Sequence, residues 1–397
     1  MKVLFVTWDS GATDYLPSLF FPIFAALRER GVHVHTLQGT YGAAEDVARV
    51  AAQAEALGVG YRAYVVPSER RRLRMPLTIR RFAQTIAEEA ARVDVDIVMP
   101  RAIVPAAACM LAARQHKKRV LVWDADGLPA DERVDFAGWS PHGAPYWGMR
   151  GAEWLMLRAA QRVMVRTKAA AEILAQRGGA SLRERTVIVP NGRSESCYVR
   201  DEGARTRLRA RLGVSDATPV LVSVGTQGPQ YLTDLQASIV AAFIERWPDA
   251  KAVFLTAQDT FVHAALDRAG VPASARVVQR VAADEVPDWL SAADVGLATR
   301  QPSFSQRAVS PLKVGEYLLA SLPVIATLGV GDLDTQLNKD VAYCLDVEKP
   351  LDAVALVDWF ARVGQREETG ARARALGLRF FSQDATVSGY LRLLRGR

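Results

Sequence analysis

Two side chains near residue 315 combine the charges needed to bind a phosphorylated ligand that also carries hydroxyl groups. Lys313 and Glu316 are three residues apart, so on a helix they share one face. A lysine close to the start of that helix could neutralise a diphosphate together with the helix dipole. The carboxylate could accept hydrogen bonds from both hydroxyls of a ribose. We expect this helix at residues 311–321, with Ser310 as its N-cap and Pro311 at its first position.

The same residues also allow a purely structural interpretation. Ser310 could simply cap the start of the helix through its hydroxyl. Glu316 could then form a salt bridge with Lys313 instead of meeting a ligand. Spacing alone does not decide between a ligand site and a capped helix.

A glycine-rich turn at residues 225–228 (GTQG) is a second candidate for contact with phosphate. Glycine lets the backbone approach a phosphate closely, and a following helix would supply free N–H groups. The turn is not GxGxxG, and no GxxxxGK[ST] is present, so nicotinamide dehydrogenases and P-loop ATPases lose their main support. No GxSxG is present either, which argues against a serine hydrolase.

Asp124 and Asp126 follow an apolar run at 119–123. At the carboxyl end of a parallel strand they would lie where doubly wound sheets bind ligands. One of them could orient or deprotonate a substrate hydroxyl, or both could form an Asx-turn after the strand.

Asp-x-Asp can also bind Mg²⁺ or Mn²⁺, but the pattern recurs at residues 94–96 and 332–334. His33 and His35 alternate on one expected strand without an evident third ligand, so we expect a structural role for them. We therefore predict no cofactor and no essential metal.

These residues need a scaffold, and the sequence indicates an α/β protein with doubly wound parallel sheets. Short apolar runs, typical of strands covered on both faces, alternate with segments of helical spacing. We expect strands at 3–6, 32–35, 64–66, 96–99, 119–123, 163–165, 187–189, 220–224, 252–256, 277–278, 295–297 and 323–326. We expect helices at 17–30, 78–92, 104–115, 151–161, 231–245, 259–269, 284–292, 311–321 and 351–363.

The chain length of 397 residues fits two domains of about 100–200 residues each. A Pro-Asn-Gly turn at 190–192 and a polar stretch after it mark the division. We predict an N-terminal domain at 1–197, a C-terminal domain at 198–380, and a final helix at 381–397 that packs back on the N-terminal domain.

The composition indicates the class of protein and its cellular compartment. Half of the residues are hydrophobic and 23% are charged, as in ordinary globular proteins. No run of about 18 uncharged apolar residues is present, and the first residues resemble a strand more than a signal peptide. Three widely spaced cysteines fit a reducing compartment. We expect a cytoplasmic protein.

The net charge of +7 lies entirely in the N-terminal half, because residues 1–197 hold 27 Lys and Arg against 20 Asp and Glu. The densest basic cluster consists of Arg70, Arg71, Arg72 and Arg74. It could meet anionic lipid headgroups or a phosphate-bearing acceptor, or it could be a solvated loop. No aromatic residues interleave with these arginines, so we expect no nucleic acid as a partner.

The stretch around Lys313 resembles the donor-site motif of retaining glycosyltransferase family 4, in its bacterial surface-polysaccharide branch. It reads PSFSQRAVSPLKVGEYLLASLPVIA at residues 302–326. Shorter stretches resemble the family as well. They are VGTQG at 224–228 followed by Tyr231, AADVGL at 292–297, GVGD at 329–332, VPNG at 189–192 and WDADGLPADERVD at 123–135.

This resemblance implies a GT-B fold, in which two Rossmann-like domains face each other across a cleft. It implies a metal-independent transfer of a sugar from a nucleotide-sugar to a saccharide, lipid-linked or small-molecule acceptor, with retention of configuration. Glu316 would bind the ribose, and Lys313 the diphosphate. The further residues it implies are Gly225 and Thr226 beside the phosphates, Gln279, Arg280 and Val281 at the nucleobase, Ser305, Ser310 and Pro311 in the donor pocket, and Gly11, Asp126 and His142 on the acceptor side.

The sequence departs from this family at three points. Ala308 stands where many members have a glutamate, and Asp126 stands where an arginine is usual. The glycine loop lacks a basic residue that often follows it, which Arg300 or Arg307 could replace. Two other functions therefore stay open, a sugar-nucleotide 2-epimerase and a non-catalytic binding module of the same fold.

Overall fold

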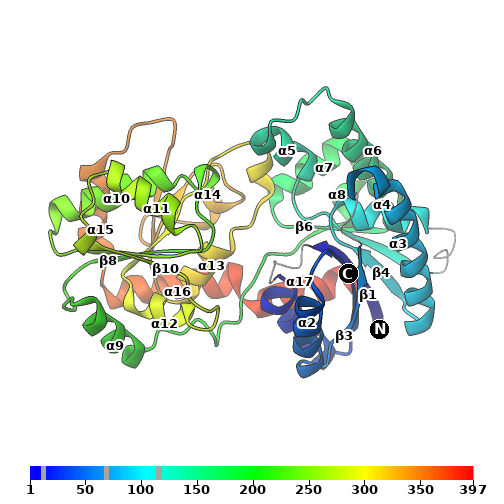
Figure 1. The fold of residues 1–397 in the computed structure, drawn as a ribbon, viewed down its shortest axis with the longest axis horizontal. Coiled ribbons are helices and arrows are strands. Elements are labelled where there is room, and N and C mark those ends of the chain that lie inside the picture. Colours follow the sequence, from blue (N-terminus) through cyan, green and yellow to red (C-terminus); the bar gives the residue numbers. More distant parts are fainter. Residues whose placement is uncertain (10–14, 67–70, 113–118, 397) are drawn as a thin grey trace. The chain divides into compact units, whose positions relative to one another are not determined.

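The computed structural model describes residues 1–9, 15–66, 71–112 and 119–396, with the backbone alone at 71–74. The chain forms two compact units (Figure 1). Unit 1 comprises Met1–Pro190 and Thr386–Arg397, and unit 2 comprises Asn191–Ala385. The sequence-based boundaries fell at 197 and 380, a few residues from the divisions in the structure.

Unit 1 is built on a seven-stranded parallel sheet with the strand order β3-β2-β1-β4-β5-β6-β7. Its central strands are apolar almost throughout, because helices cover both faces. The strands are β1 (Lys2–Asp9), β2 (His33–Thr40), β3 (Gly60–Val65), β4 (Ile97–Pro100), β5 (Val120–Asp124), β6 (Arg162–Val165) and β7 (Thr186–Ile188).

The helices of unit 1 bury apolar side chains against this sheet. Phe82 and Cys109 lie in the core on one face, in a cluster with Leu4 and Val98. The helices are a π-helical turn (Leu16–Phe20), α1 (Phe21–Glu29), α2 (Ala44–Ala56), α3 (Arg71–Val93), α4 (Ile103–Leu111), α5 (Pro129–Ala137), α6 (Ala144–Ala159), α7 (Lys168–Gly178), α8 (Leu182–Arg185) and α17 (Gln383–Arg395).

The C-terminal helix α17 completes unit 1. Tyr390 is buried, with its ring 6.4 Å from that of Phe24. Arg162 donates hydrogen bonds to the backbone carbonyls of Leu393 and Leu394. Thr386 Oγ1 donates to the carbonyl of Pro190 at 3.0 Å, so the two places where the chain enters and leaves this unit are in contact.

Unit 2 has a six-stranded parallel sheet with the order β10-β9-β8-β11-β12-β13. Tyr317 and Phe381 belong to the core on one face, and Phe243 and Phe360 to the core on the other. The strands are β8 (Val220–Val224), β9 (Lys251–Leu255), β10 (Arg276–Gln279), β11 (Val295–Ala298), β12 (Val324–Thr327) and β13 (Ala342–Leu345).

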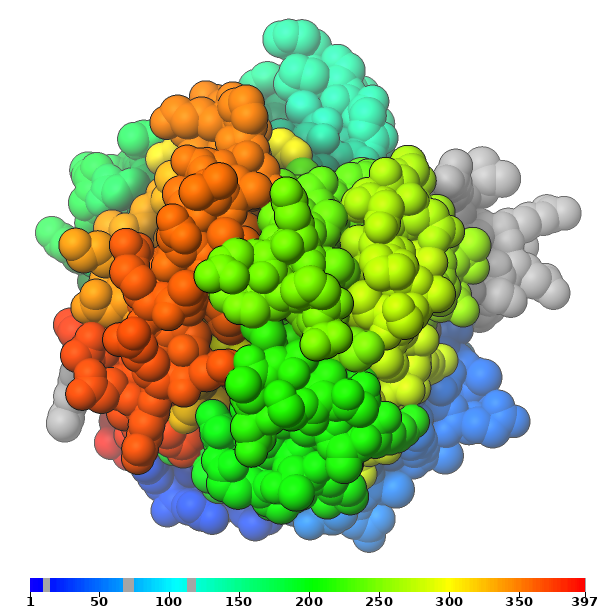
Figure 2. All heavy atoms as spheres, turned by 90° about the vertical axis from the view of Figure 1, so that its left-hand side faces the viewer, coloured from blue at the N-terminus to red at the C-terminus, as the bar shows by residue number. Residues whose placement is uncertain are grey.

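Helices also cover both faces of the second sheet, and Figure 2 shows the side formed by the green α9, the green to yellow-green α10 and α11, and the orange segment that contains α15. The α-helices are α9 (Glu202–Leu212), α10 (Thr233–Arg246), α11 (Asp259–Arg268), α12 (Val286–Ala292), α13 (Leu312–Leu319), α14 (Leu333–Gln336), α15 (Ala353–Val363) and α16 (Glu367–Phe381). Single 3₁₀ turns lie at Pro229–Tyr231, Ala273–Ala275 and Ser305–Ala308.

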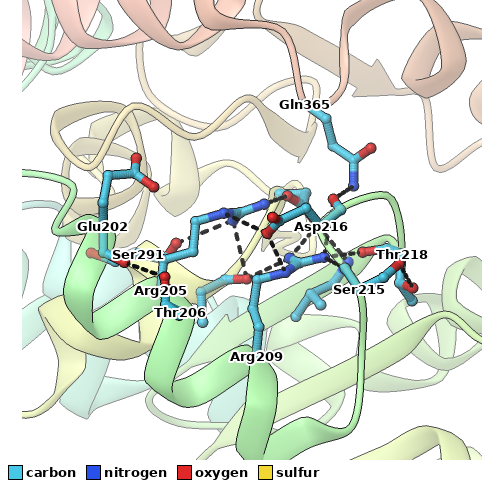
Figure 3. Close-up of polar contacts among 12 residues, drawn as sticks. Glu202, Arg205, Thr206, Arg209, Ser215, Asp216, Thr218, Ser291 and Gln365 are labelled. Carbon is cyan, nitrogen blue, oxygen red and sulfur yellow. Dashed lines mark hydrogen bonds and ion pairs between the residues drawn. The ribbon is translucent and has the colours of Figure 1, made fainter.

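A buried ionic cluster ties α9 to the sheet of unit 2. Arg205 and Arg209 project from one face of α9 (Figure 3). They bind the two oxygens of Asp294, at 2.9 Å and 3.0 Å, and Asp294 Oδ2 also accepts from the backbone N–H of Val220. Asp294, part of the AADVGL stretch, is therefore a structural residue that joins α9 to the start of β8.

The predicted fold class is confirmed, because both units are doubly wound parallel sheets. The continuous apolar runs correctly located the central strands of both sheets. None of the helices in the described part of the chain combines the length and the hydrophobicity that crossing a bilayer requires.

Candidate functional site

The glycine loop follows β8 in unit 2. Gly225 has φ +86°, a conformation that favours glycine, and its N–H donates to the carbonyl of Leu255. Gln227 is buried and holds the loop in place. Its side-chain amide donates a hydrogen bond to the hydroxyl of Ser223 and accepts one from the hydroxyl of Thr233. Gly225 and Thr226 are exposed, so the loop presents its backbone to solvent.

Lys313 reaches this loop from the first turn of α13. Its Nζ donates to the carbonyl of Thr226 at 3.2 Å and lies 4.6 Å from the ring centroid of Tyr231. No carboxylate of the described residues forms an ion pair with it. Burial lowers the pKa of Lys313 to about 7, and the positive charge of Arg300 shifts it in the same direction. The charge of Glu316 acts in the opposite direction, although Glu316 does not form an ion pair with Lys313.

A second basic side chain, Arg300, also lies over the ring of Tyr231. The guanidinium carbon of Arg300 is 5.1 Å from the ring centroid of Tyr231. Its Nε is buried and has no hydrogen-bond partner among the described residues. Arg307, the other arginine considered from sequence, lies over Phe304 instead. Arg300 is therefore the arginine that accompanies Lys313.

The helix that carries Lys313 begins differently from the sequence-based prediction. Helix α13 starts at Leu312, its N-cap is Pro311, and no side chain caps it. The prediction of Ser310 as the N-cap is wrong, because the backbone enters the helix one residue later. The carbonyl of Ser310 instead accepts a hydrogen bond from Asn191 Nδ2 at 3.3 Å. The first N–H groups of α13 are left without a side-chain cap, which favours an anionic ligand there.

Glu316 points to the segment that enters unit 2, not to Lys313. Its Oε1 accepts from Arg193 Nε at 2.7 Å and from the hydroxyl of Tyr198 at 3.1 Å. Its Oε2 has no hydrogen-bond partner within the described ranges, so it can still accept from a ligand hydroxyl. Burial and the charge of Glu316 raise the pKa of Tyr198, which keeps that hydroxyl a donor. The alternative salt bridge between Glu316 and Lys313 does not form.

The other predicted donor residues lie on loops of the same unit. Ser305 is buried in the turn before α13, and its hydroxyl is 3.3 Å from that of Ser303. The carbonyl of Gln306, the residue after the PSFS stretch, accepts from the N–H of Gly331 in the GVGD stretch. Gln279, Arg280 and Val281 lie at or just beyond the carboxyl end of β10, the outer strand. These residues, like Gly225, follow the carboxyl ends of parallel strands, where such sheets bind ligands.

In unit 1, Asp124 is wholly buried at the end of β5. Both of its oxygens accept from Arg166, at 2.8 Å and 3.0 Å, and Arg101 lies 3.9 Å away. Burial raises the pKa of Asp124 to about 6, although Arg166 opposes this shift. Because Asp124 is buried and paired with Arg166, its surroundings indicate a structural role at this edge of the sheet.

Asp126 is the more accessible aspartate, with 27% of its side chain exposed. It has φ +44° and begins a sharp turn with Gly127. Arg101 holds one of its oxygens at 2.6 Å and also approaches Asp9 at 3.5 Å. Asp126 therefore offers a positioned carboxylate at the carboxyl edge of this sheet.

The remaining predictions for unit 1 differ in how far the structure describes them. His142 is exposed in the loop before α6, and its N–H donates to Ser140. Gly11 and Arg70 lie outside the described residues. The side chains of Arg71, Arg72 and Arg74 lie outside them as well.

His35 contacts the buried carboxylate of Glu89 at 2.6 Å, a carboxylate that also binds Arg62 and Arg92. Across the described ranges, no group of three or more His, Cys, Asp or Glu side chains is suited to hold a metal ion. The prediction that no metal is needed remains a prediction.

Residues 23–195 match the family model described as Glycosyltransferase Family 4, which covers somewhat less than half of the chain. No curated protein matches the chain in sequence.

Many solved structures are similar in fold, including the following three. HepE from Anabaena, solved with UDP, shares 18% identity over 100% of both chains with a TM-score of 0.71. A glycosyltransferase from Rickettsia africae shares 13% identity over 100% of this chain and 98% of its own, with a TM-score of 0.72. A putative UDP-N-acetylglucosamine 2-epimerase from Listeria monocytogenes shares 12% over 100% and 96%, with a TM-score of 0.63. The chain has a GT-B fold.

Sequence reasoning missed the partners of the key carboxylates. Arg193 and Tyr198 lie 123 and 118 positions from Glu316, and Arg166 lies 42 positions from Asp124. The available signal was chemical, since a carboxylate predicted to lie near a core needs a cation or a hydroxyl beside it.

Proposed function

We propose that this protein is a glycosyltransferase that uses a nucleotide-sugar, most simply a UDP-sugar. The observation that carries the proposal is the pair of cations beside the glycine loop, Lys313 and Arg300, which have no carboxylate partner among the described residues. The solved complexes of HepE with UDP and with UDP-glucose make uridine the first nucleoside to test.

In this proposal the diphosphate lies between the backbone at Gly225 and the uncapped start of α13. Lys313 and Arg300 neutralise it, and the first N–H groups of α13 donate to its oxygens. Oε2 of Glu316 accepts from a ribose hydroxyl, while Arg193 and Tyr198 keep the carboxylate in place. The nucleobase meets the backbone after β10, at Gln279, Arg280 and Val281. Ser305, Ser310 and Pro311 line the pocket for the sugar.

The reaction exchanges one bond at the anomeric carbon for another. The bond to the diphosphate oxygen breaks, and the acceptor hydroxyl oxygen bonds to the anomeric carbon from the same face. The acceptor proton passes to the departing phosphate oxygen. Negative charge grows on that phosphate as it leaves, so the cations stabilise the transition state more than the bound donor. The anomeric configuration is retained, and no metal is required.

Asp126 is proposed to orient the acceptor hydroxyl. It is the accessible member of the aspartate pair, and Arg101 fixes its direction. Asp124 then acts as a positioning residue, because it holds the buried Arg166 behind the turn. His142 and Gly11 complete the acceptor side in this proposal.

A thermal-shift panel of nucleoside diphosphates and nucleotide-sugars tests the donor site. A ligand at about 100 times its Kd stabilises the fold by about 2.7 kcal/mol. We expect UDP to raise the melting temperature of the wild type, and Glu316→Ala to abolish the shift. Glu368→Ala removes a carboxylate on α16 of the same unit, whose side chain is 84% exposed, and serves as the matched control. An unchanged shift in Glu316→Ala would show that the ribose assignment is wrong.

Turnover separates this function from the two alternatives. Release of UDP that depends on an acceptor and continues in EDTA supports a metal-independent transferase. A new sugar-nucleotide epimer without an acceptor would identify an epimerase instead. Tight UDP binding without either product would leave a binding module.

A further inference from the structure

Helix α6 of unit 1 exposes an aromatic stripe. Trp147, Trp154 and Leu155 are 59%, 44% and 47% exposed, values that are high for such large apolar side chains. They lie at positions i, i+7 and i+8, so they share one face of the helix, and Arg158 at i+11 extends it. Within the described residues, Trp147 and Trp154 are the two exposed tryptophans.

The stripe is not the face by which α6 packs on its own unit. Met156 and Leu157 are buried and fill that role, and α6 packs against α4 and α5. Helix α6 thus presents apolar side chains on both sides, where an ordinary surface helix would present polar ones to water. Something other than unit 1 is expected to cover the outer side.

The charges on α6 indicate what covers it. Arg158 is exposed, and its guanidinium carbon lies 4.3 Å from the ring centroid of Trp154. The acidic residue of α6, Glu153, is 2% exposed and pairs with Arg150 and Arg177. The exposed face therefore carries aromatic groups and positive charge without a carboxylate.

We propose that this stripe docks unit 1 on the surface of an anionic lipid bilayer. Indole rings favour the headgroup region of a bilayer, where an apolar ring and a polar N–H are both accommodated. Arg158 then meets lipid phosphate, and the positive excess of residues 1–197 adds attraction over a longer range. A second copy fits less well, because three side chains offer far less than the roughly 800 Å² per partner of a stable interface.

The test is co-sedimentation of the full chain with vesicles. We expect binding to phosphatidylcholine vesicles that contain about one-third phosphatidylglycerol, weak binding to phosphatidylcholine alone, and a loss of affinity in high salt. The Trp147→Ala, Trp154→Ala double variant should bind about 100-fold more weakly. Arg158→Ala should lose about fivefold, and mainly on the anionic vesicles.

Val354→Ala is the matched control, because Val354 is 69% exposed on α15 of unit 2 and should leave vesicle binding unchanged. Circular dichroism and an unchanged urea-unfolding midpoint show that the double variant is folded. Wild-type protein that stays in solution with anionic vesicles overturns the proposal, as does full binding by the double variant. A dimer that is lost in the double variant, without vesicle binding, would assign the stripe to a second copy of the chain. The proposal does not depend on the proposed transferase activity.

Discussion

The two units differ in whether the positive side chains near the carboxyl ends of their strands are paired with carboxylates. In unit 1 the arginines at the edge are neutralised internally, since Arg166 binds Asp124 and Arg101 binds Asp126. In unit 2 Lys313 and Arg300 face the same tyrosine ring, and no carboxylate of the described residues pairs with Lys313. The positive charge of Arg300 adds to the effect of burial in lowering the pKa of Lys313.

In the proposed function, this difference distinguishes a structural cluster in unit 1 from a binding site in unit 2. The buried ions of unit 1 fix the turn that carries Asp126, and their pairing leaves no charge for a ligand to neutralise. The cations of unit 2 gain their balancing charge when an anion binds. Stability should therefore depend most on the cluster of unit 1, and UDP affinity most on the cations of unit 2.

The largest effect on stability is expected from Asp124→Ala. The substitution leaves the guanidinium of Arg166 buried without its carboxylate, which costs about 3–5 kcal/mol of unfolding free energy. Urea unfolding followed by circular dichroism measures the loss. A change below about 1 kcal/mol would mean that water or another anion takes the place of Asp124.

Lys313→Ala should weaken UDP binding about tenfold or more, in line with about 1.5–3 kcal/mol for a hydrogen bond to a charged group. Its unfolding free energy should not fall, because the variant removes a cation that burial disfavours. Turnover should drop more than affinity, since charge on the phosphate grows in the transition state. Calorimetric titration and steady-state kinetics measure these effects, with the exposed Lys339→Ala as control. Full turnover in Lys313→Ala would remove this residue from the mechanism.

The affinity for UDP should depend on pH through the protonation of Lys313. With a pKa of about 7 in the free protein, Lys313 loses its proton as the pH rises through neutrality. UDP then binds with uptake of a proton, so its affinity should fall about tenfold between pH 7 and pH 8.5. Titration calorimetry in buffers of different ionisation enthalpy detects the proton. Lys313→Arg should bind UDP without this slope, because arginine stays charged.

The stability of the unliganded protein should change in the opposite sense. The unfolded lysine keeps its proton up to about pH 10.5, whereas the folded one releases it near pH 7. The unfolded chain therefore binds more protons between these values, and the contribution of Lys313 to stability rises with pH there. A stability contribution that falls over this window would contradict the lowered pKa.

A smaller loss of stability than in Asp124→Ala is expected from Asp126→Asn. Its side chain is partly exposed, and Arg101 keeps its contacts with Asp124 and Asp9, so the loss should stay below about 1 kcal/mol. Acceptor-dependent turnover should nevertheless fall at least tenfold if Asp126 orients the acceptor, while UDP affinity is unchanged. Equal turnover in the variant and the wild type would exclude that role.

Features of the fold and of the candidate site that depend on local sequence patterns could be predicted, whereas contacts between residues far apart in the chain could not. Continuous apolar runs such as those in β4 and β8 report burial on both faces, so the two sheets could be read from the sequence. The position of Lys313 beside the glycine loop also follows from local patterns, because both segments adjoin carboxyl ends of neighbouring strands.

The pairing of the buried charges could not be predicted. Arg193 reaches Glu316 across 123 residues, and no spacing rule connects them. Helix α13 starts one residue later than predicted, because Pro311 has ψ 114° and serves as the N-cap. The sequence-based prediction places this proline at the first helical position, which it also fits. Asp294 belongs to a stretch that resembles the family, and its partners on α9, which no local pattern predicts, show a structural role.

The contact between Pro190 and Thr386 has a practical consequence for dissecting the molecule. Topologically, unit 2 is an insertion into a loop of unit 1. A peptide bond or a short linker from residue 190 to residue 386 would close the host into one continuous polypeptide that retains Tyr390. The excised insert would likewise begin and end at neighbouring points, because Gln383 N–H donates to the carbonyl of Arg193. Cutting the gene once, by contrast, leaves the host without its last helix.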